Sequence, residues 1–141
     1  MGLELPPVVP PAGVYVPAVR SGSYVYSSGQ VPLVDGELAV TGRVGVDVSL
    51  DDAKQAARIC ALNALAAVAS LVDIDQVKQV VKVVGFVNSD PDFSSQAQVI
   101  NGASELLGAV FGAAGQHARS AIGVAALPLG APVEVELVVE V

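Results

Sequence analysis

The chain has 141 residues, of which 52% are hydrophobic and only 15% are charged, and its formal net charge is −7. This length fits one domain, and a soluble domain normally carries about 25% charged residues, so we expect apolar surface to meet another copy of the chain. The alternative is an Ala- and Val-rich monomer. The few Lys and Arg residues do not cluster, which argues against nucleic-acid binding and against docking on anionic membranes.

Cysteine content and hydropathy limit the location of the protein. Cys60 is the only cysteine, so no intrachain disulfide can form and a cytoplasmic location is expected. The N-terminus lacks the basic and apolar regions of a signal peptide. The most apolar helical stretch, 59–72, is too short to span a bilayer. We therefore expect one domain over 1–141, with residues 1–12 as a Pro-rich extended segment.

The first elements in chain order are short strands. Apolar β-branched and alternating Tyr residues predict strands over 14–19 and 23–28. Asp35-Gly36 lies between 31–34 and 37–40, which is a typical hairpin signal. The opening section therefore predicts an antiparallel β-meander.

A helix is predicted next. Ser49 is a suitable N-cap, and acidic residues follow it in the first turn. Small apolar residues recur at helical spacing after it: Ala53, Ala56, Ala57, Cys60, Ala64, Val68 and Leu71. This stripe suits close packing on a sheet, and Cys60 lies within it. We therefore interpret Cys60 as a packing residue and not as a nucleophile.

The second half predicts a strand, a helix and two more strands. The β-branched run 77–87 is typical of a central strand covered on both faces. The following helix begins after Ser94 or Ser95 and ends at Gly112 and Gly115. Its apolar stripe is Val99, Ile100, Ala103, Leu106, Leu107, Val110 and Phe111. The last strands cover 119–127 and 133–141, with the turn at 127–130.

This order predicts an α+β fold, in which two βαβ-type crossovers build one mixed sheet with both helices on one face. In the last strand, alternate residues should face the helices: Val133, Val135, Leu137, Val139 and Val141. The opposite face receives Glu134, Glu136, Val138 and Glu140. A half-polar open face suits an oligomer with a cleft at its interface.

Few residues can carry chemistry. The sequence lacks a phosphate-binding glycine loop, a metal-ligand cluster and a nucleophile elbow, and His117 is its only histidine. Arg119 opens an otherwise uncharged strand, and its guanidinium suits a carboxylate held by two hydrogen bonds. The alternative is an internal ion pair with Glu134 or Glu136 across the last hairpin.

Several motifs resemble one family. These are Ser28-Gly29-Gln30-Val31-Pro32, Ala118-Arg119-Ser120, Leu127-Pro128 and Val133-Glu134-Val135-Glu136. In this order and spacing they resemble the signatures of the RidA/YjgF reactive-intermediate deaminases, from about Gly13 to the C-terminus. The stretches 100–104 and 117–120 resemble a divergent subgroup. The resemblance implies a chorismate-mutase-like fold and a homotrimer, whose sheets form a central barrel with clefts between subunits.

Site roles follow from the resemblance alone. It implies hydrolysis of 2-imino or enamino acids to 2-keto acids and ammonia, without a cofactor or metal. Arg119 would hold the substrate carboxylate, and Glu134 would position or activate the attacking water. The remaining cleft residues would be Tyr15, Ser28, Gly29 and Asn101. Each of these residues also has a structural alternative, such as packing, a strand end or a solvated helix surface.

Other functions remain open at this point. The same cleft could capture a small carboxylate or keto acid without turnover, as a binding module. Departures from the family pattern support this alternative, because His117 replaces a frequent proline, Ala121 replaces a cysteine of some members, and Gly123 is unusually small. Ribonuclease activity is also attributed to some members, but the acidic charge argues against it.

Overall fold

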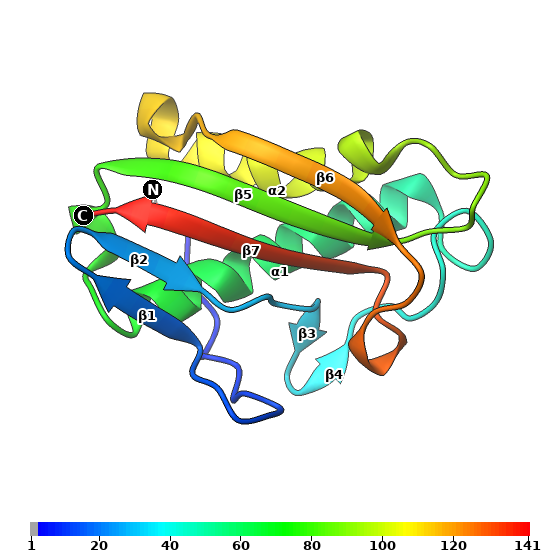
Figure 1. Ribbon diagram of the computed structural model, residues 1–141, viewed down its shortest axis with the longest axis horizontal. Helices are drawn as coiled ribbons and strands as arrows, with labels where there is room; N and C mark the ends of the chain where they lie inside the picture. The colour runs from blue at the N-terminus through cyan, green and yellow to red at the C-terminus, as the bar shows by residue number, and fades with distance from the viewer. Residues whose placement is uncertain (1–2) are drawn as a thin grey trace.

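The computed structural model describes residues 3–141 as a five-stranded mixed sheet with two helices on one face (Figure 1). Its strands lie in the order β1-β2-β7-β5-β6, and β3 and β4 form a separate two-stranded sheet. The elements are β1 (Ala18–Ser21), β2 (Tyr24–Ser27), β3 (Leu33–Val34), β4 (Glu37–Leu38), α1 (Leu50–Ala69), β5 (Gln79–Asn88), α2 (Gln96–Phe111), β6 (Ala118–Val124) and β7 (Val133–Glu140). Short 3-10 helices cover Ile74–Gln76, Gly112–Gly115 and Pro128–Gly130. The predicted α+β class is confirmed.

Both predicted crossovers are present. Strand β5 pairs in parallel with β6, and α2 connects them. Strand β7 pairs antiparallel with both β2 and β5, so β2 and β5 run in the same direction on either side of it. Helix α1 makes the connection from the β2 side of the sheet to β5. The C-terminal strand therefore fills the gap that this first crossover leaves (Figure 1).

Two predictions about strand pairing were wrong. The last two strands do not form a hairpin, because β5 lies between β6 and β7. The opening strands do not form one meander either, because β2 pairs with β7 while β3 pairs only with β4. Local turn signals predicted each hairpin, but they carry no information on which long-range partner completes a sheet. The Asp35-Gly36 turn itself is confirmed, with positive φ at both residues as a type I′ turn requires.

Close packing of α1 and α2 depends on small residues. The Ser49 hydroxyl caps α1 by accepting a hydrogen bond from the Asp52 amide, as predicted. The alanine stripe of α1 is buried together with Cys60, although Leu71 lies beyond the helix end and is exposed. On α2, Gly102 lies against the Lys54 backbone carbonyl, and a Cβ at this position would collide with it. The two helices therefore approach each other at a point where only glycine fits.

The two faces of the sheet differ as the last strand predicted. Its residues Val133, Val135, Leu137 and Val139 are buried under the helices. The alternate residues, with Glu134 and Glu136 among them, are half-buried on the open face. Strand β5 is covered by helices on one face only, so the prediction of cover on both faces was wrong for the single chain. Tyr24 and Tyr26 are exposed on β2. No helix within residues 3–141 has the length and apolar character needed to cross a membrane.

Candidate functional site

Arg119 lies on the edge strand β6, and its guanidinium is held against helix α2. Its Nη1 donates to Asn101 Oδ1 at 2.7 Å and to Ser104 Oγ at 3.2 Å. Its Nη2 donates to the Ala97 carbonyl oxygen at 3.3 Å, where the contact is open to solvent. Asn101 and Ser104 are three residues apart, so they lie on the same face of the helix. The guanidinium is thus fixed in place by neutral groups.

The Arg119 guanidinium keeps free donors. Both hydrogens of Nη1 are directed at acceptors on α2, and one hydrogen of Nη2 is used by Ala97. A guanidinium has five N–H donors, so Nε–H and one hydrogen of Nη2 remain. Within residues 3–141 the one ion pair joins Lys54 to Glu105, and Arg119 has no carboxylate partner. The suggested internal ion pair of Arg119 with Glu134 or Glu136 is therefore wrong, because β5 separates the strands that carry them.

A serine and a histidine extend this arrangement. Ser104 Oγ lies 2.9 Å from His117 Nε2, and His117 Nδ1 lies 2.6 Å from the Gly115 carbonyl oxygen. A carbonyl oxygen can only accept, so Nδ1 carries the hydrogen and Nε2 of the neutral ring accepts from the Ser104 hydroxyl. Gly115 is buried against the Leu107 backbone, where a Cβ would collide, so its carbonyl oxygen is fixed. We call Asn101, Ser104, His117 and Arg119 the arginine cluster.

Glu134 lies on β7 with its carboxylate against Gly29. A Cβ at Gly29 would collide with the Glu134 carboxylate, so only glycine allows this approach. The pKa of Glu134 is raised from its ordinary value, first by burial and then by the neighbouring charge of Glu136. A carboxyl group with a raised pKa holds and releases protons closer to neutral pH, which suits acid–base chemistry.

Ser28 precedes Gly29 in the chain and connects it to the N-terminal segment that carries Tyr15. The Ser28 hydroxyl donates to the Val16 carbonyl oxygen at 2.6 Å, which ties the N-terminal segment to the end of β2. Tyr15 is half-exposed on that segment, and its Oη accepts a hydrogen bond from the Ala12 amide at 3.3 Å. We call Ser28, Gly29 and Glu134, together with Tyr15 on the segment that Ser28 anchors, the glutamate cluster.

The two clusters are separated within one chain. Arg119 is in register with Val83 on β5, and Glu134 is in register with Phe86. These two β5 residues are three positions apart, and side chains alternate along a strand, so Arg119 and Glu134 leave the sheet on opposite faces. The strands that carry them are also two strand spacings apart, or about 9–10 Å. The structure therefore brings the predicted site residues together in two groups and not in one.

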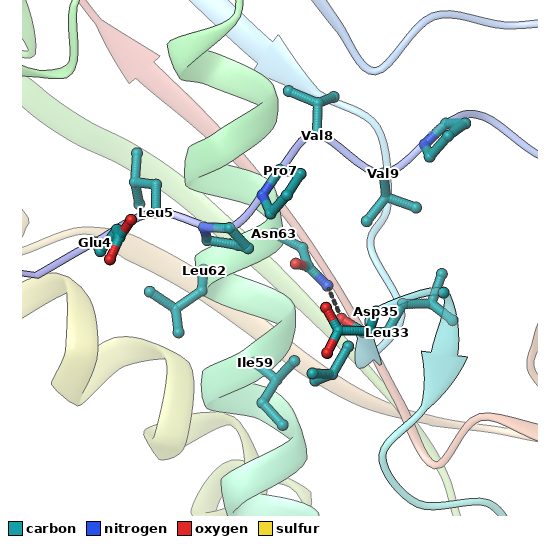
Figure 2. Close-up of a pocket in the computed structure, with 14 residues that line it drawn as sticks. Glu4, Leu5, Pro7, Val8, Val9, Leu33, Asp35, Ile59, Leu62 and Asn63 are labelled. Carbon is teal, nitrogen blue, oxygen red and sulfur yellow. Dashed lines mark hydrogen bonds between the residues drawn. The ribbon is translucent and has the colours of Figure 1, made fainter.

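One cavity of the single chain lies away from both clusters. A cavity of about 510 Å³ lies between the N-terminal segment, α1 and the β3–β4 hairpin (Figure 2). Its walls are largely apolar, with Leu5, Val9, Ile59 and Leu62 among them, and the Asn63 amide at its floor donates to the Leu33 carbonyl oxygen. No member of either cluster lines it. The part of the chain that the structure describes also holds no group of three His, Cys, Asp or Glu residues that could bind a metal.

The sequence assigned no site role to Ser104 or His117. Asn101 and Ser104 have the i, i+3 spacing of one helix face, and this spacing could have indicated that Ser104 lies beside Asn101. The predicted crossover pairs β6 in parallel with β5 and brings α2 over the start of β6. The sequence did not reveal that this packing places both residues beside Arg119.

Comparisons with known proteins agree with this fold. Residues 1–141 match the model of the family described as "YjgF/chorismate_mutase-like, putative endoribonuclease". Protein TCP17 of Trypanosoma cruzi is 46% identical over 99% of this chain and 89% of its own length.

Solved structures are similar over nearly the whole chain. The Agrobacterium tumefaciens protein Atu1372 superposes with a TM-score of 0.91 at 45% identity, covering 99% of this chain and 86% of that one. Escherichia coli TdcF with bound serine superposes with a TM-score of 0.69 at 26% identity, covering 96% of this chain and 92% of that one.

Proposed function

Because the chain belongs to the YjgF/RidA family, we propose that it is a deaminase that hydrolyses reactive 2-imino or enamino acids to 2-keto acids and ammonia. The observation that carries this proposal is the Arg119 guanidinium, which is fixed by neutral groups and keeps Nε–H and an Nη2 hydrogen free. A cation that is fixed without a carboxylate partner in the described chain suits a carboxylate supplied by a ligand.

The site that we propose lies between two subunits of a homotrimer. Within one chain the arginine cluster and the glutamate cluster are on opposite faces of the sheet. A single chain therefore cannot bring both clusters to one substrate. The low charged fraction and the uncovered open face of the sheet support an assembly that buries this face. In a cyclic trimer the edge strand β6 of one subunit would meet the glutamate cluster of the next.

The proposed reaction needs little beyond positioning. Arg119 would hold the substrate carboxylate, and Asn101 would keep the guanidinium in place. A water held by the ionised carboxylate of Glu134 on the neighbouring subunit would attack the imine carbon. Glu134 would take a proton from this water and pass it to the nitrogen, which gives a carbinolamine. Transfer of the remaining hydroxyl proton to the nitrogen through Glu134 would then break the C–N bond, so that the 2-keto acid forms and ammonia leaves. Imines already hydrolyse in water, so orientation of the reactants supplies much of the acceleration.

The remaining cleft residues have simpler proposed roles. Gly29 would allow the Glu134 carboxylate to lie against the backbone, since a side chain at this position would occupy its place. Ser28 would anchor the segment that carries Tyr15, and the half-exposed Tyr15 ring would cover the substrate. None of these roles requires a cofactor.

A second candidate is a binding module that captures a small carboxylate without turnover. It is supported by the neutral environment of Arg119 and by the similarity to TdcF, whose structure holds serine, an amino acid with a carboxylate. Ribonuclease activity has less support, because a net charge of −7 and dispersed basic residues offer no footprint for phosphates.

Release of keto acid and ammonia from freshly generated 2-iminopropanoate and 2-iminobutanoate tests the proposal. The wild type should accelerate the hydrolysis, Arg119→Ala should lose both turnover and carboxylate binding, and Glu134→Gln should lose turnover but keep binding. If the wild type hydrolyses no imine and Glu134→Gln still binds pyruvate, the deaminase proposal is wrong and the binding module is supported.

A further inference from the structure

The surroundings of Arg119 contain a chain of hydrogen bonds that the proposed reaction does not use. It runs from Arg119 Nη1 to Ser104 Oγ, then from the Ser104 hydroxyl to His117 Nε2, and it ends with His117 Nδ1–H on the Gly115 carbonyl oxygen. Ser104 and His117 are both half-buried, on α2 and just before β6 respectively. Neither residue lies near Glu134, so the chain of bonds belongs to the arginine side of the proposed cleft.

The direction of each bond follows from the fixed end. The Gly115 carbonyl oxygen can only accept, which places the hydrogen of the neutral imidazole on Nδ1. His117 Nε2 is then an acceptor, and it takes the Ser104 hydroxyl hydrogen. A guanidinium can only donate, so it needs a lone pair of Ser104 Oγ facing it. The histidine therefore sets the orientation of the serine hydroxyl that Arg119 requires.

The same chain of bonds decides which donors of Arg119 remain for a ligand. Ser104 and Asn101 occupy both hydrogens of Nη1, so the donors left over are Nε–H and one hydrogen of Nη2. The Nη2 side is the solvent-exposed side of the group. Without Ser104, Nη1 would regain a free hydrogen, and only Asn101 and the Ala97 carbonyl oxygen would hold the guanidinium on α2.

We propose that Ser104 and His117 are positioning residues, which hold Arg119 so that its Nε and Nη2 donors face the carboxylate of the ligand. The inference rests on the proposed function, because it assigns a carboxylate to Arg119. It adds two residues to that site and a defined order in which they act, with His117 acting only through Ser104.

The first test needs no ligand. His117 is the only histidine, so the imidazole ¹⁵N signals of the wild-type protein require no assignment. At a pH where the ring is neutral, the proposal predicts that Nδ1 is protonated and Nε2 is not. A neutral ring protonated on Nε2 would overturn the proposal, because such a ring cannot accept the Ser104 hydrogen.

The second test measures pyruvate affinity by calorimetry for Ser104→Ala, His117→Ala and the double variant. A lost hydrogen bond to a charged group predicts that Ser104→Ala weakens binding by roughly tenfold. His117→Ala should weaken it less, and it should have no further effect in the Ser104→Ala background, since its action passes through the serine. Ser104→Thr should restore affinity, and the turnover number for saturating imine should change far less than the pyruvate affinity.

Ser95→Ala is the matched control, because Ser95 precedes α2 and makes no capping hydrogen bond with its side chain. If Ser104→Ala binds pyruvate as tightly as Ser95→Ala, the positioning role fails, and imine turnover by the wild type would still support the deaminase. If the wild type binds pyruvate through Ser104 but hydrolyses no imine, the deaminase fails and the positioning role stands. Additive losses in the double variant would contradict the order of action.

Discussion

Arg119 and Glu134 leave the same sheet on opposite faces, because their partners on β5, Val83 and Phe86, are three residues apart. Arg119 turns toward α2, where Asn101, Ser104 and the Ala97 carbonyl oxygen receive its hydrogen bonds. Glu134 turns to the open face, where it lies against Gly29. Because of this separation, the proposed site is complete only when two subunits contribute to it.

The contact between Gly29 and Glu134 predicts a sensitive position. We expect Gly29→Ala to displace the Glu134 carboxylate, since the added Cβ would occupy its place. Imine turnover should fall by about tenfold or more, as misplaced catalytic groups commonly cause. Pyruvate binding through Arg119 should change little. Ser28→Ala is the control, because it removes the hydrogen bond to the N-terminal segment without adding an atom beside the Glu134 carboxylate. Gly22→Ala would not serve, because the positive φ of Gly22 makes any substitution there strained.

The raised pKa of Glu134 predicts a pH-dependent effect on stability. A carboxyl group whose pKa is higher in the folded than in the unfolded protein is destabilising when ionised, so its cost is present above the folded pKa. Glu134→Gln should therefore raise the Tm at neutral pH. The increase should disappear as the pH falls toward about 4, where the unfolded carboxyl group is also protonated. Thermal unfolding at a series of pH values checks this, and an equal increase at every pH would contradict it.

Two glycines of α2 give opposite predictions for the same substitution. Gly102→Ala should destabilise the protein by about 1–3 kcal/mol, because its Cβ would collide with the Lys54 carbonyl oxygen and push the helices apart. Gly108→Ala should stabilise it by about 0.5–1 kcal/mol, because that position is exposed and open and alanine favours the helix. Chemical denaturation of the two variants measures both effects. If both substitutions change the free energy of unfolding by a similar amount, helix propensity and not packing determines the effect at Gly102.

Burial predicts that the Cys60 thiol is unreactive. Burial raises the pKa of this thiol well above its ordinary value, and the charge of Glu134 raises it further. Its Sγ contacts the Val133 carbonyl oxygen beneath the sheet. A thiol reagent such as dithionitrobenzoate should therefore label the protein only after unfolding in denaturant. Rapid labelling of the native protein at pH 8 would contradict the packing role.

The helices, the central strand and the alternation of the last strand could be predicted because their signals are local. Ser49, Asp35-Gly36 and the alternation from Val133 to Val139 each act within a few residues. Strand order could not be predicted in this way. The placement of β7 between β2 and β5 depends on contacts between distant segments, and it leaves β5 between the strands that carry Arg119 and Glu134.

For the candidate site too, local signals could be predicted and contacts between distant segments could not. Arg119 stood out because an isolated charge in an apolar strand needs a partner. Its actual partners, Asn101, Ser104 and Ala97, come from a helix whose position depends on the crossover. Gly29 and Glu134 were predicted as site residues from the motif resemblance alone. The structure shows why a glycine is needed, because a Cβ at Gly29 would collide with the Glu134 carboxylate.

The most direct test of a site shared between subunits is complementation between two inactive variants. Arg119→Ala and Glu134→Gln subunits would be coexpressed with different affinity tags, and trimers that carry both tags would be assayed with 2-iminobutanoate. In a head-to-tail trimer that carries both variants, about one cleft in three combines an intact Arg119 with an intact Glu134. Turnover should therefore return in the mixed trimers, while each variant alone stays inactive. Mixed trimers as inactive as the separate variants would contradict a site built from both subunits.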